Sequence, residues 1–169
     1  IIHAANSAAM LTLPEAGFTL ARAGVAIYGL PPSDEVGLPA GFAPALAFRT
    51  LVAQVRWIPA GEGVSYGATY VTAPPTRLAT LPVGYADGFR RAPRNWGETL
   101  IRGRRAPLVG RVSMDMIAAD VSELPGVAVG DRVELWGTEL PVEELAAAAA
   151  TIPYELVCAV SQRVPIELV

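Results

Sequence analysis

Three short segments of the chain combine tyrosine with glycine and charged residues in a pattern that could build a reactive site. They are Ser65-Tyr66-Gly67-Ala68-Thr69-Tyr70, Gly84-Tyr85-Ala86-Asp87-Gly88 and Gly110-Arg111-Val112-Ser113-Met114-Asp115. Tyrosines set between glycines in turn-like segments can present their phenol groups at a surface instead of burying them. Phenol groups so placed could take part in proton transfer. All 13 basic residues of the chain are arginines, so it contains no lysine.

Two regions of different composition must position these segments. Residues 1 to about 30 suggest an apolar strand end, a short helix around residues 14–21 and a second strand over residues 25–28, the rhythm of an α/β unit. The prolines at 31, 32 and 39 interrupt any regular element. The sequence therefore predicts a terminal α/β-barrel fragment with its linker over residues 1–42, and a second domain over residues 43–169.

The second region is predicted to be mainly β. Alternating side chains over residues 51–57 suit a half-buried strand, and an Arg102-Gly103 turn suits a hairpin. Proline and glutamates at the start of residues 141–150 favour one helix. Further strand-like runs cover residues 77–81, 99–101, 106–112, 116–121 and 131–136. The expected fold is an antiparallel β-barrel or sandwich preceded by the last strand-helix-strand piece of an α/β (TIM-type) barrel.

Composition limits the classes of partner. A formal net charge of -3 gives no general attraction to nucleic acid or to anionic membranes. The single cysteine, Cys158, suits a reducing compartment, and we expect it to be buried and inert. The longest apolar run is far below the roughly 18 residues that suggest a membrane span. We therefore expect a cytoplasmic protein, and the opening on Ile1-Ile2-His3 suggests a piece of a longer chain.

The motifs together resemble the C-terminal part of alanine racemases, fold type III enzymes that use pyridoxal 5'-phosphate (PLP). The resemblance runs through the whole chain in order, and no single motif carries it. The matching segments are His3-Ala4-Ala5-Asn6-Ser7, Arg22 to Gly29, Ser65 to Tyr70, Gly84 to Gly88, Arg111 to Asp115, Thr151-Ile152-Pro153-Tyr154-Glu155 and Arg163-Val164-Pro165.

The resemblance implies a bacterial isomerase that interconverts L- and D-alanine through a PLP aldimine and supplies D-alanine for peptidoglycan. Racemisation removes a proton from one face of the α-carbon and returns one to the other, so two bases must flank the substrate. Tyr66 matches the base that acts on L-alanine. A free phenol has a pKa of about 10, so such a base needs nearby positive charge. The second base in the family is the lysine that anchors PLP, which this chain lacks, so we expect the chain alone to be inactive.

The same resemblance assigns the remaining site residues. Arg22 matches the residue that faces the pyridine nitrogen, where a guanidinium keeps that nitrogen unprotonated, and His3 matches the group that orients this arginine. The phosphate-binding positions correspond to Ser7, the backbone of Gly24 and Val25, and Tyr154. Substrate-side positions correspond to Tyr85 and the Met114 backbone N–H, and entry-channel positions to Arg91, Arg111 and Ile152. The family is a homodimer whose active site is shared between subunits.

Other interpretations remain open. Tyr66, Tyr70 and Tyr85 could be ordinary amphipathic residues with satisfied hydroxyls. A solvated surface cluster could equally account for Arg90, Arg91 and Arg94. The chain could also be a non-catalytic β domain that associates with itself. Serine racemases of this fold share the motifs, and amino-acid decarboxylases share its outline but carry a Cys-Asp motif, whereas Ala159 follows Cys158 here.

Overall fold

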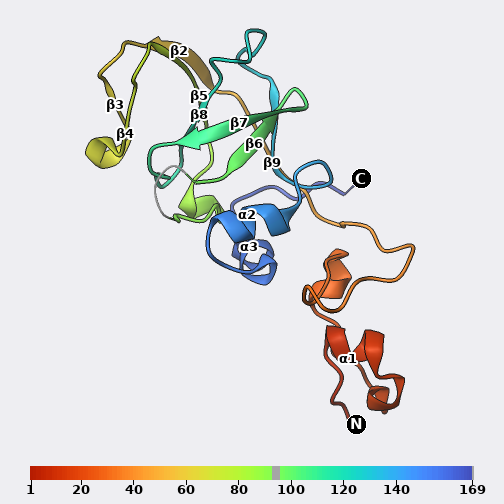
Figure 1. Ribbon diagram of the computed structural model, residues 1–169. Helices are drawn as coiled ribbons and strands as arrows, with labels where there is room; N and C mark the ends of the chain where they lie inside the picture. The colour runs from red at the N-terminus through yellow and green to blue at the C-terminus, as the bar shows by residue number, and fades with distance from the viewer. Residues whose placement is uncertain (93–95, 169) are drawn as a thin grey trace. The chain divides into compact units, whose positions relative to one another are not determined.

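A computed structural model describes residues 1–92 and 96–168, and the chain divides into two compact units, Ile1–Leu46 and Ala47–Val169 (Figure 1). The predicted boundary after residue 42 stays a prediction. The larger unit is mainly antiparallel β-sheet, as the sequence predicts.

The smaller unit contains only short helices among its elements. These are α1 (Ser7–Thr12) and the 3-10 helices η1 (Pro14–Gly17) and η2 (Val25–Tyr28). The Asn6 side chain caps α1 by accepting the Ala9 N–H at 2.9 Å. Gly29 ends η2 with a φ of 68°, and a Cβ there would lie 1.8 Å from the Ala43 carbonyl oxygen, so only glycine fits.

Three local predictions for this unit are wrong. The strand end expected at the start of the chain is absent, because residues 1–6 belong to no strand or helix. Val25–Tyr28 form a 3-10 helix instead of a strand, because an apolar run of four residues between glycines does not distinguish the two by periodicity. Helical structure after Pro14 ends at Gly17, and the α-helix lies before the proline, which favours a break at that point.

The larger unit is built on a seven-stranded antiparallel sheet in the order β1-β9-β6-β7-β8-β5-β2. A separate two-stranded ribbon, β3 (Gly63–Val64) with β4 (Tyr70–Val71), projects from it. The seven strands are β1 (Phe48–Leu51), β2 (Gln54–Ile58), β5 (Thr76–Leu81), β6 (Glu98–Ile101), β7 (Arg104–Val109), β8 (Ile117–Asp120) and β9 (Arg132–Trp136).

The sheet curls because its two edge strands are consecutive in the chain. Only Val52 and Ala53 separate β1 from β2. The Val52 N–H donates to the Asp131 carbonyl at 2.9 Å, and the Ala53 N–H donates to the Thr80 carbonyl at 2.9 Å. The chain thus passes from beside β9 to beside β5, and the two edges meet. The continuous half-buried strand expected over residues 51–57 is therefore wrong: it breaks at this crossing, and Trp57 is exposed.

The predicted hairpin turn is confirmed. Arg102 and Gly103 join β6 to β7 with φ values of 55° and 71°. Two successive positive φ values match the twist of a tight β-hairpin.

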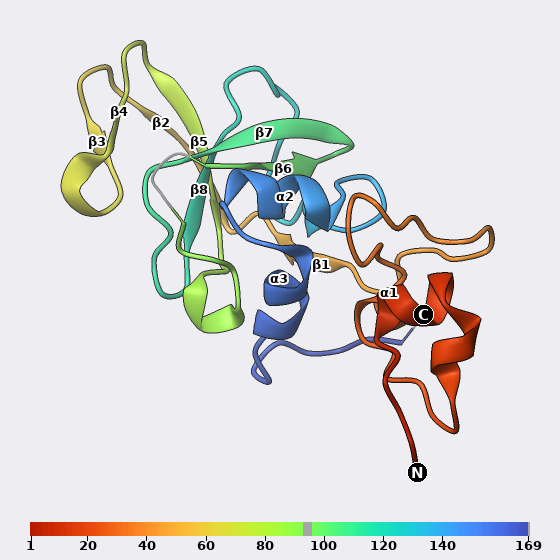
Figure 2. The ribbon, with the colours of Figure 1, turned by 60° about the horizontal axis from the view of Figure 1, so that its bottom comes forward.

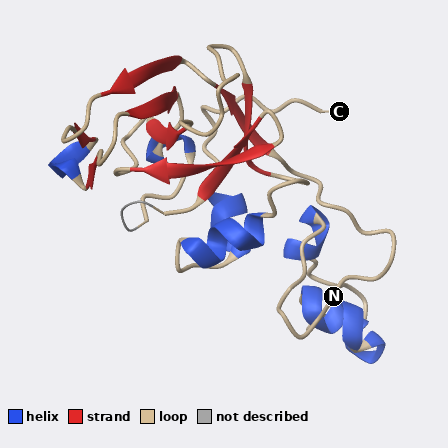
Figure 3. Cartoon of the chain, turned by 45° about the horizontal axis from the view of Figure 1, so that its top comes forward, coloured by secondary structure: helices blue, strands red, loops and turns tan. Residues whose placement is uncertain are grey.

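Two helices, α2 (Val142–Ala148) and α3 (Pro153–Ala159), lie together beside the sheet (Figures 2 and 3). Leu145 of α2 packs toward the hairpin, since a Cβ at Gly97 would lie 3.1 Å from its Cδ1. The helix near residue 141 is confirmed, whereas α3 is not predicted by the sequence. Cys158 lies on α3 and is exposed, which corrects the expectation that it is buried.

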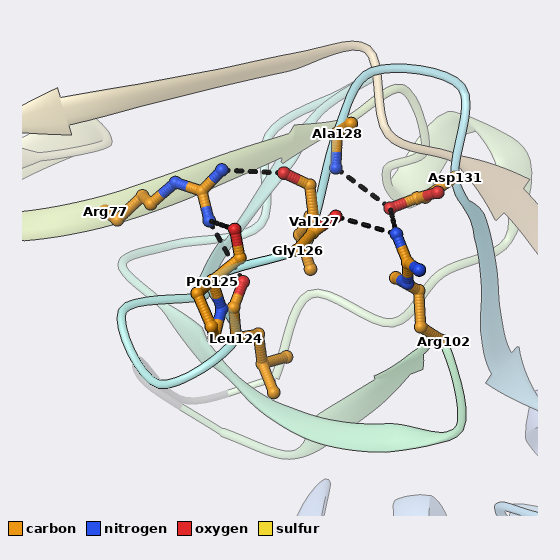
Figure 4. Close-up of polar contacts among 8 residues, drawn as sticks. All are labelled: Arg77, Arg102, Leu124, Pro125, Gly126, Val127, Ala128 and Asp131. Carbon is orange, nitrogen blue, oxygen red and sulfur yellow. Dashed lines mark hydrogen bonds and ion pairs between the residues drawn. The ribbon is translucent and has the colours of Figure 1, made fainter.

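Two arginines hold the loop between β8 and β9 (Figure 4). The Arg77 guanidinium donates to the carbonyl oxygens of Leu124, Pro125 and Val127 at 3.0, 3.1 and 2.7 Å. Arg102 donates to the Gly126 carbonyl at 2.7 Å. The fixed fork of N–H groups on each guanidinium satisfies loop carbonyls that have no strand partner.

Candidate functional site

Tyr66 lies in a strained turn at the tip of the β3–β4 ribbon. It begins the 3-10 helix η3 (Tyr66–Ala68), and the residue is 72% exposed. Ser65 has φ 63° and ψ -177°, and Gly67 and Ala68 have φ values of 72° and 43°. Non-glycine residues rarely adopt such angles, at a cost of about 1–3 kcal/mol each, so surrounding contacts must hold this turn. The turn therefore presents the phenol at the surface of the larger unit.

The contacts that hold this turn come from the Gly110 segment. The Ser65 hydroxyl donates to the Arg111 carbonyl at 2.7 Å. Gly110 has a φ of 78°, and a Cβ there would lie 2.8 Å from the Ser65 Cβ and 3.0 Å from the Val64 carbonyl oxygen. The first and third motifs therefore meet through close backbone approach, and Arg111 itself stays exposed.

The second motif meets the third in the same way. Tyr85 begins the 3-10 helix η4 (Tyr85–Asp87), whose N–H groups donate from Tyr85 to the Ser113 carbonyl at 3.1 Å and from Ala86 to the Met114 carbonyl at 2.9 Å. A Cβ at Gly84 would lie 2.3 Å from the Ser113 oxygen and 2.5 Å from the Met114 carbonyl carbon. The side chains of Tyr85 and Met114 are 49% and 54% exposed. One continuous backbone arrangement thus links the segments of Tyr66, Met114 and Tyr85.

The start of α3 carries two further predicted residues. Ile152 is its exposed N-cap residue, and Tyr154 follows in the first turn. The next residue, Glu155, accepts hydrogen bonds from the Thr151 hydroxyl and from Arg90, with which it forms an ion pair.

These contacts to Glu155 have an electrostatic consequence. The Thr151 hydrogen bond, and then that of Arg90, lower the pKa of the Glu155 carboxyl. Arg90 is therefore tied to α3, while Arg91 is exposed and Arg94 lies outside the described residues.

The smaller unit brings together Ser7 and Gly24. The buried Ser7 hydroxyl oxygen accepts the Gly24 N–H at 2.9 Å and the Ala26 N–H at 3.4 Å. Val25, between them, begins η2. The Ser7 oxygen thus accepts from two backbone N–H groups, and its own O–H can donate to a further acceptor.

Arg22 is fixed beside the first residues of the chain. Its N–H donates to the Ala5 carbonyl at 2.8 Å, and its guanidinium to the Ala4 carbonyl at 3.3 Å. The bonded carbonyls follow His3 directly in the sequence, and the imidazole is exposed.

Sequence reasoning missed three residues that shape these segments. Ser65 bonds the Arg111 carbonyl, Asp87 bonds the Gly84 N–H at 2.8 Å, and Glu155 bonds Arg90. Each stands next to or within a recognised motif, which is the one signal that could have found it. In the described parts of the chain, no three or more histidine, cysteine or carboxylate side chains gather as a metal site would require. None of the helices described is long and apolar enough to cross a bilayer.

Comparison with known proteins gives a consistent result. Residues 45–168 match the family model "Alanine racemase, C-terminal domain". The chain is 49% identical over 166 residues to the alanine racemase of Desulfovibrio desulfuricans, covering 98% of the chain and 45% of that protein.

Solved structures of alanine racemases are also similar to this chain. The biosynthetic alanine racemase of Pseudomonas aeruginosa superposes with a TM-score of 0.87 at 44% identity, over 96% of this chain and 46% of that one. The alanine racemase of Bacillus anthracis, solved with bound L-Ala-P, has a TM-score of 0.87 at 40% identity, over 96% of this chain and 43% of that one. The chain spans about half the length of the relatives it matches.

Proposed function

Because the chain belongs to the alanine racemase family, we propose that the protein containing it interconverts L-alanine and D-alanine with PLP. The observation that carries the proposal is the convergence of the three motifs, which presents Tyr66, Tyr85 and Met114 on segments joined by direct backbone contacts. The L-Ala-P held by the Bacillus anthracis relative supports alanine as the substrate.

The residues of the smaller unit fit the phosphate of PLP. The Ser7 hydroxyl oxygen accepts the Gly24 N–H and can rotate to donate its own proton to an anion, and the backbone N–H of Val25, the next residue, would supply a further donor. A Cβ at residue 24 would lie 3.8 Å from the Ser7 oxygen, so a glycine leaves this side of the hydroxyl open. In this proposal Ser7, Gly24 and Val25 hold the phosphate, and Arg22 faces the ring nitrogen with His3 as its orienting group. The role of Tyr154 of the larger unit in phosphate binding rests on the family resemblance alone.

Tyr66 is the base on the L-alanine side. PLP, when bound, supplies the electron sink that acidifies the substrate α-carbon. The phenol oxygen of Tyr66 takes the α-proton from one face and returns it in the reverse direction. The glycine-rich turn fixes this residue, because a base on a freely moving loop would lose the orientation on which proton transfer depends. The lysine that serves the opposite face comes from sequence outside these 169 residues.

Tyr85 and Met114 bind the substrate in this scheme. A backbone N–H, such as that of Met114, can donate to the substrate carboxylate, and the negative charge of that acceptor strengthens the hydrogen bond. The exposed Arg91, Arg111 and Ile152 line the approach to the site.

We further propose a cytoplasmic bacterial homodimer whose D-alanine enters peptidoglycan. The exposed side chains of Tyr66, Met114 and Ile152 support this arrangement, because a partner subunit that completes the site would cover them.

The test is an assay of L- to D-alanine conversion by the full-length protein loaded with PLP, comparing Tyr66→Phe with Tyr70→Phe. Removing a catalytic base costs about 10²- to 10⁴-fold, so Tyr66→Phe should lose at least about 100-fold in kcat. Tyr70 is the matched control, because it lies in the same ribbon and its hydroxyl makes only a 3.5 Å contact with Asp120. Absence of racemisation by the unaltered protein would refute the function, and equal effects of the two substitutions would refute the role of Tyr66.

A further inference from the structure

Asp87 is a mostly covered carboxylate that the proposed reaction does not use. Its side chain is 14% exposed, and each of its oxygens has a separate partner. Oδ2 accepts the Gly84 N–H at 2.8 Å, which closes the loop that carries Tyr85. Oδ1 lies 3.0 Å from Nε of Arg163, a residue near the C-terminus, and forms an ion pair with it.

The backbone reinforces this link to the C-terminal segment. The Ser161 N–H donates to the Asp87 carbonyl at 3.0 Å. A Cβ at Gly88, where φ is 100°, would lie 2.2 Å from the Ala159 carbonyl oxygen. The segment from Ala159 to Arg163 therefore packs directly against one side of the loop.

The same loop also contacts the Met114 segment. The Tyr85 and Ala86 N–H groups donate to the carbonyls of Ser113 and Met114 at 3.1 and 2.9 Å. The loop is thus fixed between two segments, and any movement of it would shift Tyr85 and the Met114 backbone relative to each other.

We infer that Asp87 is a positioning residue which, with Arg163, sets the spacing between Tyr85 and the Met114 N–H. The inference rests on the proposed function, in which both groups bind alanine. The carboxylate is required because one of its oxygens accepts the Gly84 N–H and the other pairs with the Arg163 guanidinium. Asparagine has the same shape but one acceptor oxygen, so its NH₂ group would face either the Gly84 N–H or the Arg163 guanidinium.

The first experiment measures amide hydrogen exchange by NMR in the full-length protein. Hydrogen bonds to charged groups are stronger than those between neutral groups, so losing one should speed exchange at Tyr85 and Ala86 by at least about 10-fold in Asp87→Asn. Arg163→Met should give a smaller increase of about 3-fold, because a partly exposed ion pair contributes less. Unchanged exchange at both amides in Asp87→Asn would overturn the inference, whether or not the full-length protein racemises alanine.

The second experiment measures KM and kcat for alanine in the full-length protein. Loss of positioning in the binding segment should raise KM by about 5- to 10-fold in Asp87→Asn and change kcat by less than about 3-fold.

Arg49→Met is the matched control for the kinetics. Arg49 is 55% exposed and pairs with a 14% exposed Glu134, the same exposures as Arg163 and Asp87. A purely structural role would lower stability in Asp87→Asn with KM unchanged, and that result would overturn the inference. Failure of the unaltered protein to racemise alanine would instead refute the proposed function.

Discussion

Replacing Gly84 with alanine tests the close approach on which the site depends. The added Cβ would lie 2.3 Å from the Ser113 oxygen and 2.5 Å from both the carbonyl carbon and the oxygen of Met114. All three are backbone atoms, so no side chain can rotate away, and the two segments must move apart. Gly84 has a φ of -156°, which any residue adopts, so the effect is steric and not conformational.

The expected cost follows from overpacking. Forcing an extra methyl group into a packed site costs about 1–3 kcal/mol, and a contact with backbone on two residues places Gly84→Ala at the upper end. Alanine also lowers the conformational entropy of the unfolded chain, which offsets about 0.4–1 kcal/mol of this cost. The net loss is about 2 kcal/mol, equivalent to roughly 5–10 °C in Tm for a unit of this size.

Gly126→Ala is the matched control in the same unit. A Cβ at Gly126 would meet only the end of the Arg102 side chain, at 3.6 Å, and this glycine does not have a positive φ. Its Tm should stay unchanged or rise slightly, because only the unfolded-state effect remains. Thermal unfolding followed by circular dichroism checks both variants. Equal Tm values for the two would refute the close approach of Gly84 to Ser113 and Met114.

Two further predictions concern stability. Arg77→Met removes three charged hydrogen bonds to loop carbonyls. It should lower the free energy of unfolding, measured by urea titration, by about 2–3 kcal/mol. A loss no larger than that of Arg49→Met would contradict the role of Arg77 in holding the loop between β8 and β9. The Thr151 and Arg90 contacts lower the folded-state pKa of Glu155 below its usual 4.5. The contribution of these contacts to the free energy of unfolding is therefore complete at pH values above 4.5, and it is lost as the pH falls through the lower pKa of the folded state. Glu155→Gln should remove this part of the acid dependence in Tm measurements between about pH 3 and 6, and an unchanged pH profile would contradict it.

Local signals were sufficient to predict much of the larger unit. The strand-like runs expected over residues 77–81 and 116–121 correspond to β5 and β8, and the Arg102-Gly103 turn follows from a glycine that tolerates positive φ. The helix α3 was missed although Pro153 and Glu155 suit a helix start, because seven residues form too short a periodic pattern.

The convergence of the motifs depends on contacts that spacing does not reveal. Glycine is required at positions 84 and 110 because backbone from segments far away in sequence lies too close for a Cβ. The sequence does not reveal this, because a glycine in a turn-like motif equally suits a simple turn. Ser65 adopts an angle typical of glycine and is held by a hydrogen bond across 46 residues, which no local propensity predicts. The motif residues were found by resemblance, and the residues that hold them in place came only from the structure.

The most direct test of the central claim follows each face of the α-carbon separately. Full-length protein is incubated in D₂O with L-alanine or D-alanine, and loss of the α-proton signal is measured by NMR for the unaltered protein and for Tyr66→Phe. If Tyr66 is the base on the L side, the substitution slows proton loss from L-alanine by at least about 100-fold and slows that from D-alanine far less. Equal slowing from both enantiomers, or no slowing at all, would contradict the assignment.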